Sequence, residues 1–273
     1  MGKVKIKKKS TLIDMTAMSD VTVLLLTFFM LTSTFLKKEP TVVYTPSSVS
    51  EEAIPSSNLI TVLVSSADKK DPNNIEGEGK IFLSFTGDSL ISNENLRVLI
   101  LDEALKIWNK QHPKNNITLT DRERANFSKI QMMGTPFMNL KNALSMEPAK
   151  LEAEQTDLKN PNVGIPINDN NDPDGRLNDF QIWCQAINYV ASDKRKEKIQ
   201  QMGLDESTPE GRDKIRDLDI LYNSVKQGTG ITVKADKDTP FTTVQLVFDN
   251  LQTMKLNKFS LMTALKSEDE PTN

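Results

Sequence analysis

The sequence predicts a single N-terminal transmembrane α-helix followed by an α+β domain, in which helices pack on a small mixed sheet and a largely helical insertion extends the middle. Three observations support this fold class. One apolar run occupies residues 15–36, short strand-like segments lie at both ends of the remaining chain, and segments with helical spacing of apolar residues lie between them. A chain of 273 residues is long enough for one or two domains.

The composition excludes several classes of function. A net charge of −3 predicts no general affinity for nucleic acid. The single cysteine, Cys184, rules out an internal disulfide framework, and we interpret it as a small core residue. The single histidine, His112, lies in the turn-like stretch KQHPKNN, which argues against a histidine metal site or a Ser-His-Asp triad. Because the sequence also lacks a glycine-rich phosphate loop, we expect neither an enzyme nor a bound cofactor.

The apolar run from Met15 to Leu36 would reach about 33 Å as a helix, which matches a hydrocarbon core of about 30 Å. Its lysines are unevenly distributed, because five precede the run within residues 1–14 and only two follow it at 37–38. This excess predicts a cytoplasmic tail over 1–14, a transmembrane helix over 15–36 and a periplasmic domain beyond an inner membrane. A cleaved signal peptide is the alternative, but LTSTFLKKEP lacks a small-x-small cleavage site.

Asp20 is the unusual residue of this run. An aspartate near a bilayer centre costs roughly 2.5–3.5 kcal/mol. Asp20 could simply mark the membrane boundary, but a span from Val21 to Leu36 would reach only about 24 Å. In a helix, four polar residues lie instead on one stripe: Thr16, Asp20, Thr27 and Thr34. Stripes of this kind face another helix rather than lipid. We therefore expect a partner helix from another chain against this seam.

A carboxyl group in such a seam can carry protons. Desolvation favours its protonated form, so Asp20 could bind a proton from one side of the membrane and release it to the other. One charge crossing 100 mV is worth about 2.3 kcal/mol, which can drive a mechanical change. Asp14 precedes the apolar run and is interpreted as an interfacial or helix-capping residue.

The ends of the domain show strand and helix patterns. Residues 37–58 are rich in Pro, Ser and Glu and predict a flexible linker, residues 59–265 form the domain, and 266–273 a disordered tail. The early elements are a hairpin of Leu59–Ser65 with Gly79–Ser84 and a helix over Glu94–Lys110 capped by Asn93. The late elements are a strand over Ile231–Ala235, a helix that Thr239 and Pro240 cap and open, and a parallel strand over Lys258–Ala264.

The insertion, about residues 111–227, is mostly helical in pattern. A capped helix begins at Thr120-Asp-Arg-Glu, Gly134-Thr-Pro breaks it, and further helices are expected at Phe137–Ser145, Leu177–Gln200 and Asp213–Lys226. The loop Pro161–Gly175 contains the front of an EF-hand pattern. Its twelfth position is Gln181 rather than a bidentate Glu, so we interpret it as a turn rich in Asn and Asp.

The membrane segment resembles the ExbD/TolR family of biopolymer transport proteins. The family motif has a Thr, an Asp four residues later and a Leu-rich run ending in Phe-Met, which correspond here to Thr16, Asp20, Leu24–Leu26 and Phe29-Met30. Ala17 replaces the Pro that usually follows the Thr. The stretch GITVKADKDTPFTTVQLVFDNL is similar to the family's closing strand–helix–strand unit. The stretches GTPFMNLKNAL and GIPINDNN resemble long ExbD-like proteins of the Bacteroidetes type.

The resemblance implies a motor subunit. Two copies of the helix would lie inside a ring formed by an ExbB/TolQ-like polytopic protein, protons would be the coupling ion at Asp20, and the complex would energise a TonB-like protein. An exposed edge of the sheet could accept a strand from such a partner. The alternative is a TolR-like envelope-integrity protein, or a module tethered to peptidoglycan, in which Asp20 is structural. A membrane-anchored enzyme is a third reading that no motif supports.

Overall fold

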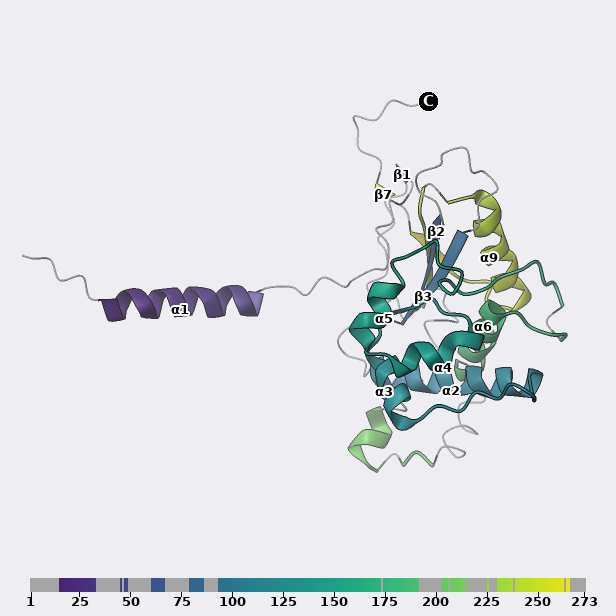
Figure 1. Ribbon diagram of the computed structural model, residues 1–273, viewed down its shortest axis with the longest axis horizontal. Helices are drawn as coiled ribbons and strands as arrows, with labels where there is room; N and C mark the ends of the chain where they lie inside the picture. Colours follow the sequence, from purple (N-terminus) through teal and green to yellow (C-terminus); the bar gives the residue numbers. More distant parts are fainter. Residues whose placement is uncertain are drawn as a thin grey trace, which may run out of the picture. The chain divides into compact units, whose positions relative to one another are not determined.

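The computed structural model describes residues 15–32, 45, 47–48, 60–66, 79–85, 93–172, 174–191, 203–205, 207–213, 215, 225, 230–237, 239–262 and 264–265. The chain divides into two compact units, residues 1–38 and 39–273, and each is described by itself. The first contains one helix, α1 (Met15–Thr32), shown in Figure 1. None of the helices in the described ranges combines the length and the apolar character that crossing a bilayer requires.

The second unit is built on a five-stranded mixed sheet in the order β4-β3-β2-β5-β6. The hairpin of β2 (Ile60–Ser66) and β3 (Gly79–Phe85) is antiparallel, as predicted, and β5 (Ile231–Ala235) lies parallel to β2. The sheet is completed by β4 (Met132–Met133), antiparallel to β3, and β6 (Ser260–Met262), parallel to β5. The predicted mixed sheet and parallel crossover are therefore confirmed.

The predicted closing strand is divided in two. β6 ends at Met262, and Ala264–Leu265 form β7, which pairs in parallel with β1 (Ser47–Ser48) in a separate two-stranded sheet. A single strand over Lys258–Ala264 is therefore wrong in extent. β1 lies within the predicted linker, so two residues of that linker pair with Ala264 and Leu265.

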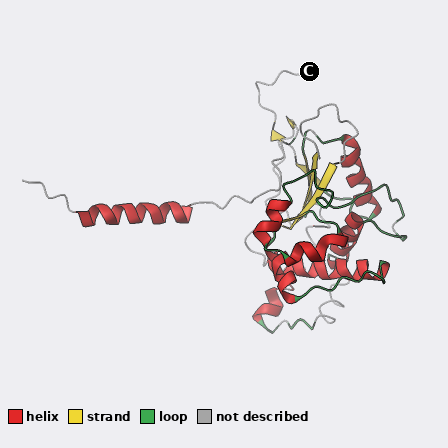
Figure 2. Cartoon of the chain, in the orientation of Figure 1, coloured by secondary structure: helices red, strands yellow, loops and turns green. Residues whose placement is uncertain are grey.

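Six helices whose bounds lie within the described residues accompany the sheet, and Figure 2 shows them beside the strands. They are α2 (Asn93–Gln111), α3 (Asp121–Lys129), α4 (Phe137–Ser145), α5 (Pro148–Glu154), α6 (Asp179–Val190) and α9 (Phe241–Thr253). Alternate residues of β2, including Ile60, Val62 and Val64, lie in the same core cluster as the buried residues of these helices. The opposite residues, Leu63 and Phe82, cluster instead with Met132 and Val163, so a loop covers that part of the other face.

Capping residues explain where several helices begin. Thr120 and Glu123 form the predicted capping box of α3. Asn178 and Gln181 form another, which is why α6 begins at Asp179 rather than at the predicted Leu177. The predicted extension of that helix over 192–200 lies outside the described residues. The same holds for most of the helix expected over 213–226, although residues 213, 215 and 225 are helical.

Two predicted caps are wrong. Asn93 is part of α2 rather than its cap. Thr239 does not cap α9, because Pro240 holds the N-cap position without a side-chain bond, and the Thr239 hydroxyl donates instead to the Val64 carbonyl at 3.2 Å. This bond joins the turn before α9 to the end of β2.

Stacked aromatic rings fill the core between the helices. Trp183, fully buried, lies parallel to Phe127 at 5.9 Å and stacks on Phe137 at 5.2 Å. Phe137 stacks in turn on Trp108 at 5.0 Å between ring centroids, as the predicted core position of Trp108 requires. Since α3, α4, α6 and α2 each supply one of these rings, the described part of the predicted insertion shares its core with the predicted early helix.

Amide side chains attach the 161–178 loop to two helices. Asn178 donates to Asn168 Oδ1 at 2.7 Å and to Asn250 Oδ1 at 2.9 Å, and Asn250 donates to the Asn168 carbonyl at 3.0 Å. Gln181, fully buried, donates from Nε2 to the Asn170 carbonyl at 2.6 Å and accepts from Asn170 Nδ2 at 2.8 Å. This network holds the loop between α6 and α9 and leaves these buried amide groups hydrogen-bonded.

Candidate functional site

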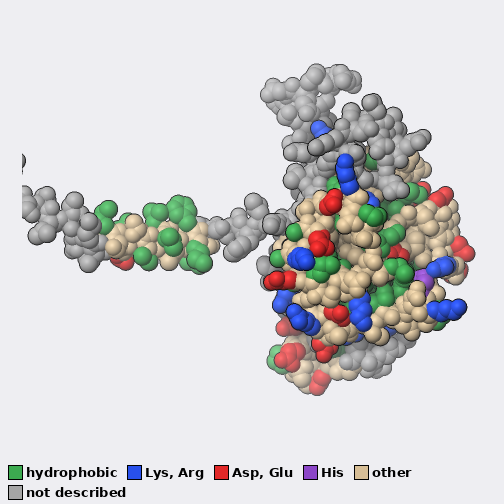
Figure 3. All heavy atoms as spheres, viewed as in Figure 1, with side chains coloured by type: hydrophobic (Ala, Val, Ile, Leu, Met, Phe, Trp, Pro, Cys, Tyr) green, Lys and Arg blue, Asp and Glu red, His purple; other side chains and the backbone are tan. Residues whose placement is uncertain are grey.

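α1 is rich in large apolar side chains that are exposed. Its described side chains cover residues 18–31, and the large hydrophobic ones are 55% to 87% exposed, from Leu25 to Leu31. Figure 3 shows these side chains around the helix. No described residue of the first unit covers these side chains.

Asp20 is the only charged residue among the described side chains of α1. At about 100° per residue, Asp20 and Thr27 lie within about 20° of each other around the helix axis. The structure therefore places these two predicted seam residues on one side. The side chain of Thr16 and all of Thr34 lie outside the described residues. Among the described residues, Asp20 has no hydrogen-bond or ion-pair partner.

The hydroxyl groups of α1 bond to its own backbone. Thr27 Oγ1 donates to the Leu24 carbonyl at 2.9 Å, and Thr22 Oγ1 reaches the carbonyls of Met18 and Ser19 at 3.1 and 2.8 Å. Threonine side chains commonly bond in this way to the backbone of membrane helices, so these bonds could be expected from the residue type alone. Thr27 therefore uses its proton within the helix and presents lone pairs, which can accept a hydrogen bond from water or from a protonated carboxyl group.

The second unit contains buried titratable groups that do not assemble into a catalytic site. Burial raises the pKa of the Cys184 thiol, which keeps it protonated and unreactive. Burial also raises the pKa of Asp179, while the Phe137 N–H that it accepts at 2.8 Å acts in the opposite direction. Within the described ranges, no group of three or more His, Cys, Asp or Glu side chains could hold a metal ion.

His112 and the turn rich in Asn and Asp have structural partners. The His112 ring stacks on Trp108 at 3.8 Å, and its Nε2 lies beside the Arg176 guanidinium, which donates to it. In the turn, Asp172 Oδ1 accepts the N–H groups of Asp174 and Gly175 at 3.0 and 3.1 Å. These are Asx-turn bonds, which agrees with the interpretation of this loop as a turn rather than a calcium site.

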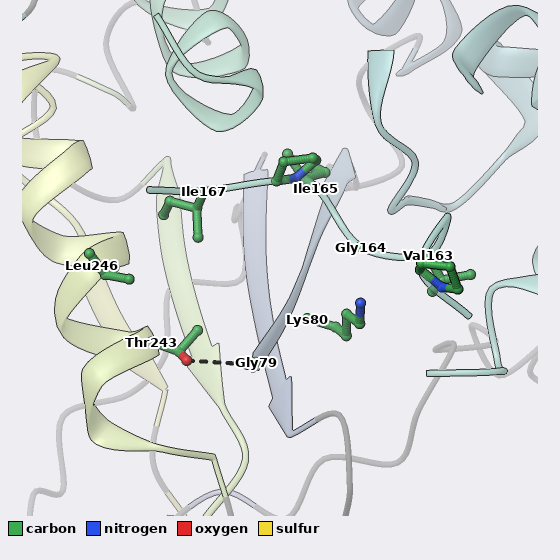
Figure 4. A pocket seen from close by; sticks show the side chains of 10 residues that line it. Gly79, Lys80, Val163, Gly164, Ile165, Ile167, Thr243 and Leu246 are labelled. Carbon is green, nitrogen blue, oxygen red and sulfur yellow. Dashed lines mark hydrogen bonds between the residues drawn. The ribbon is translucent and has the colours of Figure 1, made fainter. Parts of the chain in front are cut away.

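A cavity of about 330 Å³ lies between the start of β3, the 161–167 segment and α9. Figure 4 shows Lys80 near Gly79 and Gly164, with Thr243 and Leu246 of α9 on the opposite side of the view. Gly164 has a φ of +98°, and a Cβ there would lie 2.8 Å from Lys80 Cδ, so glycine allows the lysine stem to pack against it. Lys80 is the only charged residue of this cavity, which is too little to specify a reaction.

Comparison with known families found a match, which covers the N-terminal part of the chain. Residues 7–135 match the family model of biopolymer transport protein ExbD/TolR. This part of the chain is similar to the ExbD/TolR family. The match includes α1, the β2–β3 hairpin, α2, α3 and β4, and it ends before residues 228–265, so the family likeness of that unit stays a prediction. No curated protein and no solved structure matches the chain.

The similarity indicates a general role. Proteins of the ExbD/TolR family are inner-membrane, single-pass accessory proteins of biopolymer transport rather than enzymes. They work in general with ExbB/TolQ-type and TonB-like systems. Asp20 lies inside the matched region, on the apolar helix, and is therefore the residue on which a functional hypothesis is best built.

Proposed function

We propose that this chain is the proton-carrying subunit of an ExbB–ExbD-like inner-membrane motor, and that Asp20 binds and releases the coupling proton. The apolar helix would run through residues 15–36, with the N-terminus in the cytoplasm and the second unit in the periplasm. One observation carries the proposal: α1 presents a single carboxylate on a helix whose other described side chains are uncharged and exposed.

The environment of Asp20 follows from α1 itself. A charged carboxylate is costly on an apolar helix in lipid, so it requires a protein or water partner that α1 does not provide. We propose that the helices of an ExbB/TolQ-like ring and a second copy of this chain supply that partner. Thr27 lies about 10 Å further along the helix, too far to contact Asp20 of the same chain. Its lone pairs would accept hydrogen bonds from water or from the facing copy.

The work step follows from protonation. Protonated Asp20 is neutral and can face an apolar surface, whereas the ionised form must return to a polar one. Each proton that crosses 100 mV makes about 2.3 kcal/mol available for rotating or shifting the helix against its ring. In this proposal the second unit transmits that movement to a TonB-like protein, and peptidoglycan is a further candidate contact.

The described part of the sheet ends in two different terminal strands. Beyond β4, the Ile165 N–H donates to the Ile81 carbonyl at 2.8 Å, so the 163–165 segment occupies the outer side of β3. β6 is the other terminal strand of the sheet, and its Leu261 is 49% exposed. We propose β6 as the edge for a strand of the TonB-like protein. Backbone NMR shifts that leave Ser260–Met262 unchanged on titration with a TonB-like segment would disprove it.

The proposed motor function is tested by Asp20→Asn in the full chain, with energy-dependent uptake through an outer-membrane receptor as the readout. The substitution retains size and polarity but removes the titratable group. We expect uptake to be lost while the complex with the ExbB/TolQ-like partner still assembles. Ser19→Ala is the matched control and should keep both.

The TolR-like alternative predicts another outcome. Unchanged uptake in Asp20→Asn cells, combined with loss of envelope integrity when the whole gene is deleted, would contradict a proton-carrying Asp20. The chain would then be better described as an envelope tether.

A further inference from the structure

We propose that a cavity between α4, α5 and the 160–163 segment binds a short peptide segment of a protein partner, through a backbone amide and one small aliphatic side chain. The cavity has a volume of about 190 Å³. An engineered cavity of about 150 Å³ holds one benzene molecule, so this one has room for a single residue of a peptide. The inference uses residues far from Asp20 in the sequence and does not depend on the proposed motor function.

The lining of the cavity includes one buried polar side chain with no partner. Gln155 is 1% exposed, and both its Oε1 and its Nε2 are buried without a hydrogen bond. Thr135 lines the same cavity and is 5% exposed. Leaving a buried donor or acceptor unpaired costs about 1–3 kcal/mol, so the Gln155 amide requires an explanation.

A second buried glutamine shows how a side-chain amide forms its hydrogen bonds in this fold. Gln181 is as deeply buried as Gln155, but it donates to the Asn170 carbonyl and accepts from an Asn170 N–H group, at 2.6 and 2.8 Å. A peptide that offers one carbonyl and one N–H group would satisfy Gln155 in the same two-point manner. The ligand that fits Gln155 is therefore itself an amide.

The remaining lining indicates the class of ligand. Ala143, Leu151 and Val163 form buried apolar walls, which suit a small aliphatic side chain. Glu154 is the only charged lining residue and lies exposed, so an anionic ligand is disfavoured. No aromatic ring lines this cavity, whereas sugars are commonly held against aromatic faces. These features together favour a peptide over a phosphate group or a sugar.

The entrance contains polar groups and one flexible side chain. Asn139 donates to Asn162 Oδ1 at 2.7 Å across the rim, and the Asn162 Nδ2 group has no hydrogen bond to a described residue. The amide atoms of Gln155 are themselves covered, so a ligand reaches them only if a lining side chain rotates. Met146 is half-buried in the lining, and its unbranched thioether chain can make that movement at low cost.

The test uses the full chain in detergent micelles and N-acetyl-L-valine amide as the probe, followed by NMR of the Gln155 side-chain amide and the Met146 methyl group. We expect saturable shifts of both signals. Gln155→Met should weaken binding roughly tenfold or more, because two hydrogen bonds are lost. It should also leave the thermal midpoint unchanged or higher, because an unpaired buried amide is removed. Gln131→Met is the matched control, since Gln131 Oε1 is also buried and unpaired but lies outside the cavity.

Several outcomes would overturn the proposal. One is the absence of saturable shifts, and another is equal binding by wild type and Gln155→Met. A lower thermal midpoint of Gln155→Met without a change in binding would assign Gln155 a structural role. If N-acetylglucosamine binds and N-acetyl-L-valine amide does not, the ligand of this cavity is a sugar rather than a peptide. If Gln155→Met fails to fold, Thr135→Val is the second variant, and unchanged probe affinity there contradicts the proposal.

Discussion

The two units of this chain use apolar residues in opposite ways. In α1 the described large hydrophobic side chains are at least 55% exposed, whereas in the second unit Leu140, Phe180 and Val247 are fully buried. The second unit has helices, strands and loops with which to cover its apolar residues, and α1 has none. The difference teaches that the second unit buries its apolar residues within one chain, whereas the described residues of the first unit leave those of α1 exposed, as the proposed membrane location requires.

The largest expected effect is a loss of stability of the second unit when its aromatic core is disrupted. Trp183→Ala should destabilise the second unit by about 3–5 kcal/mol, because it removes a fully buried ring that contacts Phe127 and Phe137. Urea unfolding followed by tryptophan fluorescence of Trp108 measures the change. Tyr189→Ala, at a side chain that is 40% exposed on the same helix, is the control and should cost much less.

The next largest expected effect is a loss of membrane integration, and it concerns the first unit alone. Leu25→Asp should reduce membrane integration of α1 by roughly 2.5–3.5 kcal/mol and leave the urea midpoint of the second unit unchanged. Alkaline extraction of membranes from expressing cells measures the integrated fraction, and Leu25→Ala serves as the control. Equal integration of both variants would mean that α1 is not covered by lipid.

The second unit is also stabilised by a buried polar side chain, that of Arg97. Its buried guanidinium donates to the carbonyl groups of Phe85, Ser128 and Ile130 at 2.8, 2.6 and 2.9 Å, which joins the end of β3 to the end of α3. Arg97→Met should cost about 2–3 kcal/mol, because these acceptors lose their donor. Chemical denaturation measures it, and Arg97→Lys should restore only part of the loss, since one ammonium group cannot reproduce the forked geometry.

The smallest expected effect is a change in pH dependence. Burial raises the pKa of Asp179, so the folded chain retains this proton over a pH range in which the unfolded chain has lost it. Its contribution to stability is therefore present at acidic pH and is lost as the pH rises through the folded-state pKa. Asp179→Asn keeps an acceptor for the Phe137 N–H and should flatten this dependence in urea midpoints measured from acidic to neutral pH. An unchanged slope would show that Asp179 does not titrate in this range.

Much of the secondary structure could be predicted because its signals are local. The Thr120–Glu123 capping box, the Pro at residue 136 before α4 and the alternating apolar residues of Ile60–Ser66 each depend on neighbours within a few positions. The cap at Thr239 was wrong for the opposite reason. Its hydroxyl bonds to Val64, 175 residues away in the sequence, and no local pattern encodes that partner.

The sequence by itself determined the apolar character of residues 15–36, the position of Asp20 within it and the family motif, because these are properties of residue type and spacing along one helix. Only the tertiary structure decided that α2, α3, α4 and α6 share one aromatic core, that Gln181 is paired while Gln155 is not, and that β4 joins the sheet. The physical reason is that packing and hydrogen-bond satisfaction depend on groups distant in sequence, whereas helical periodicity and charge placement depend on nearest neighbours.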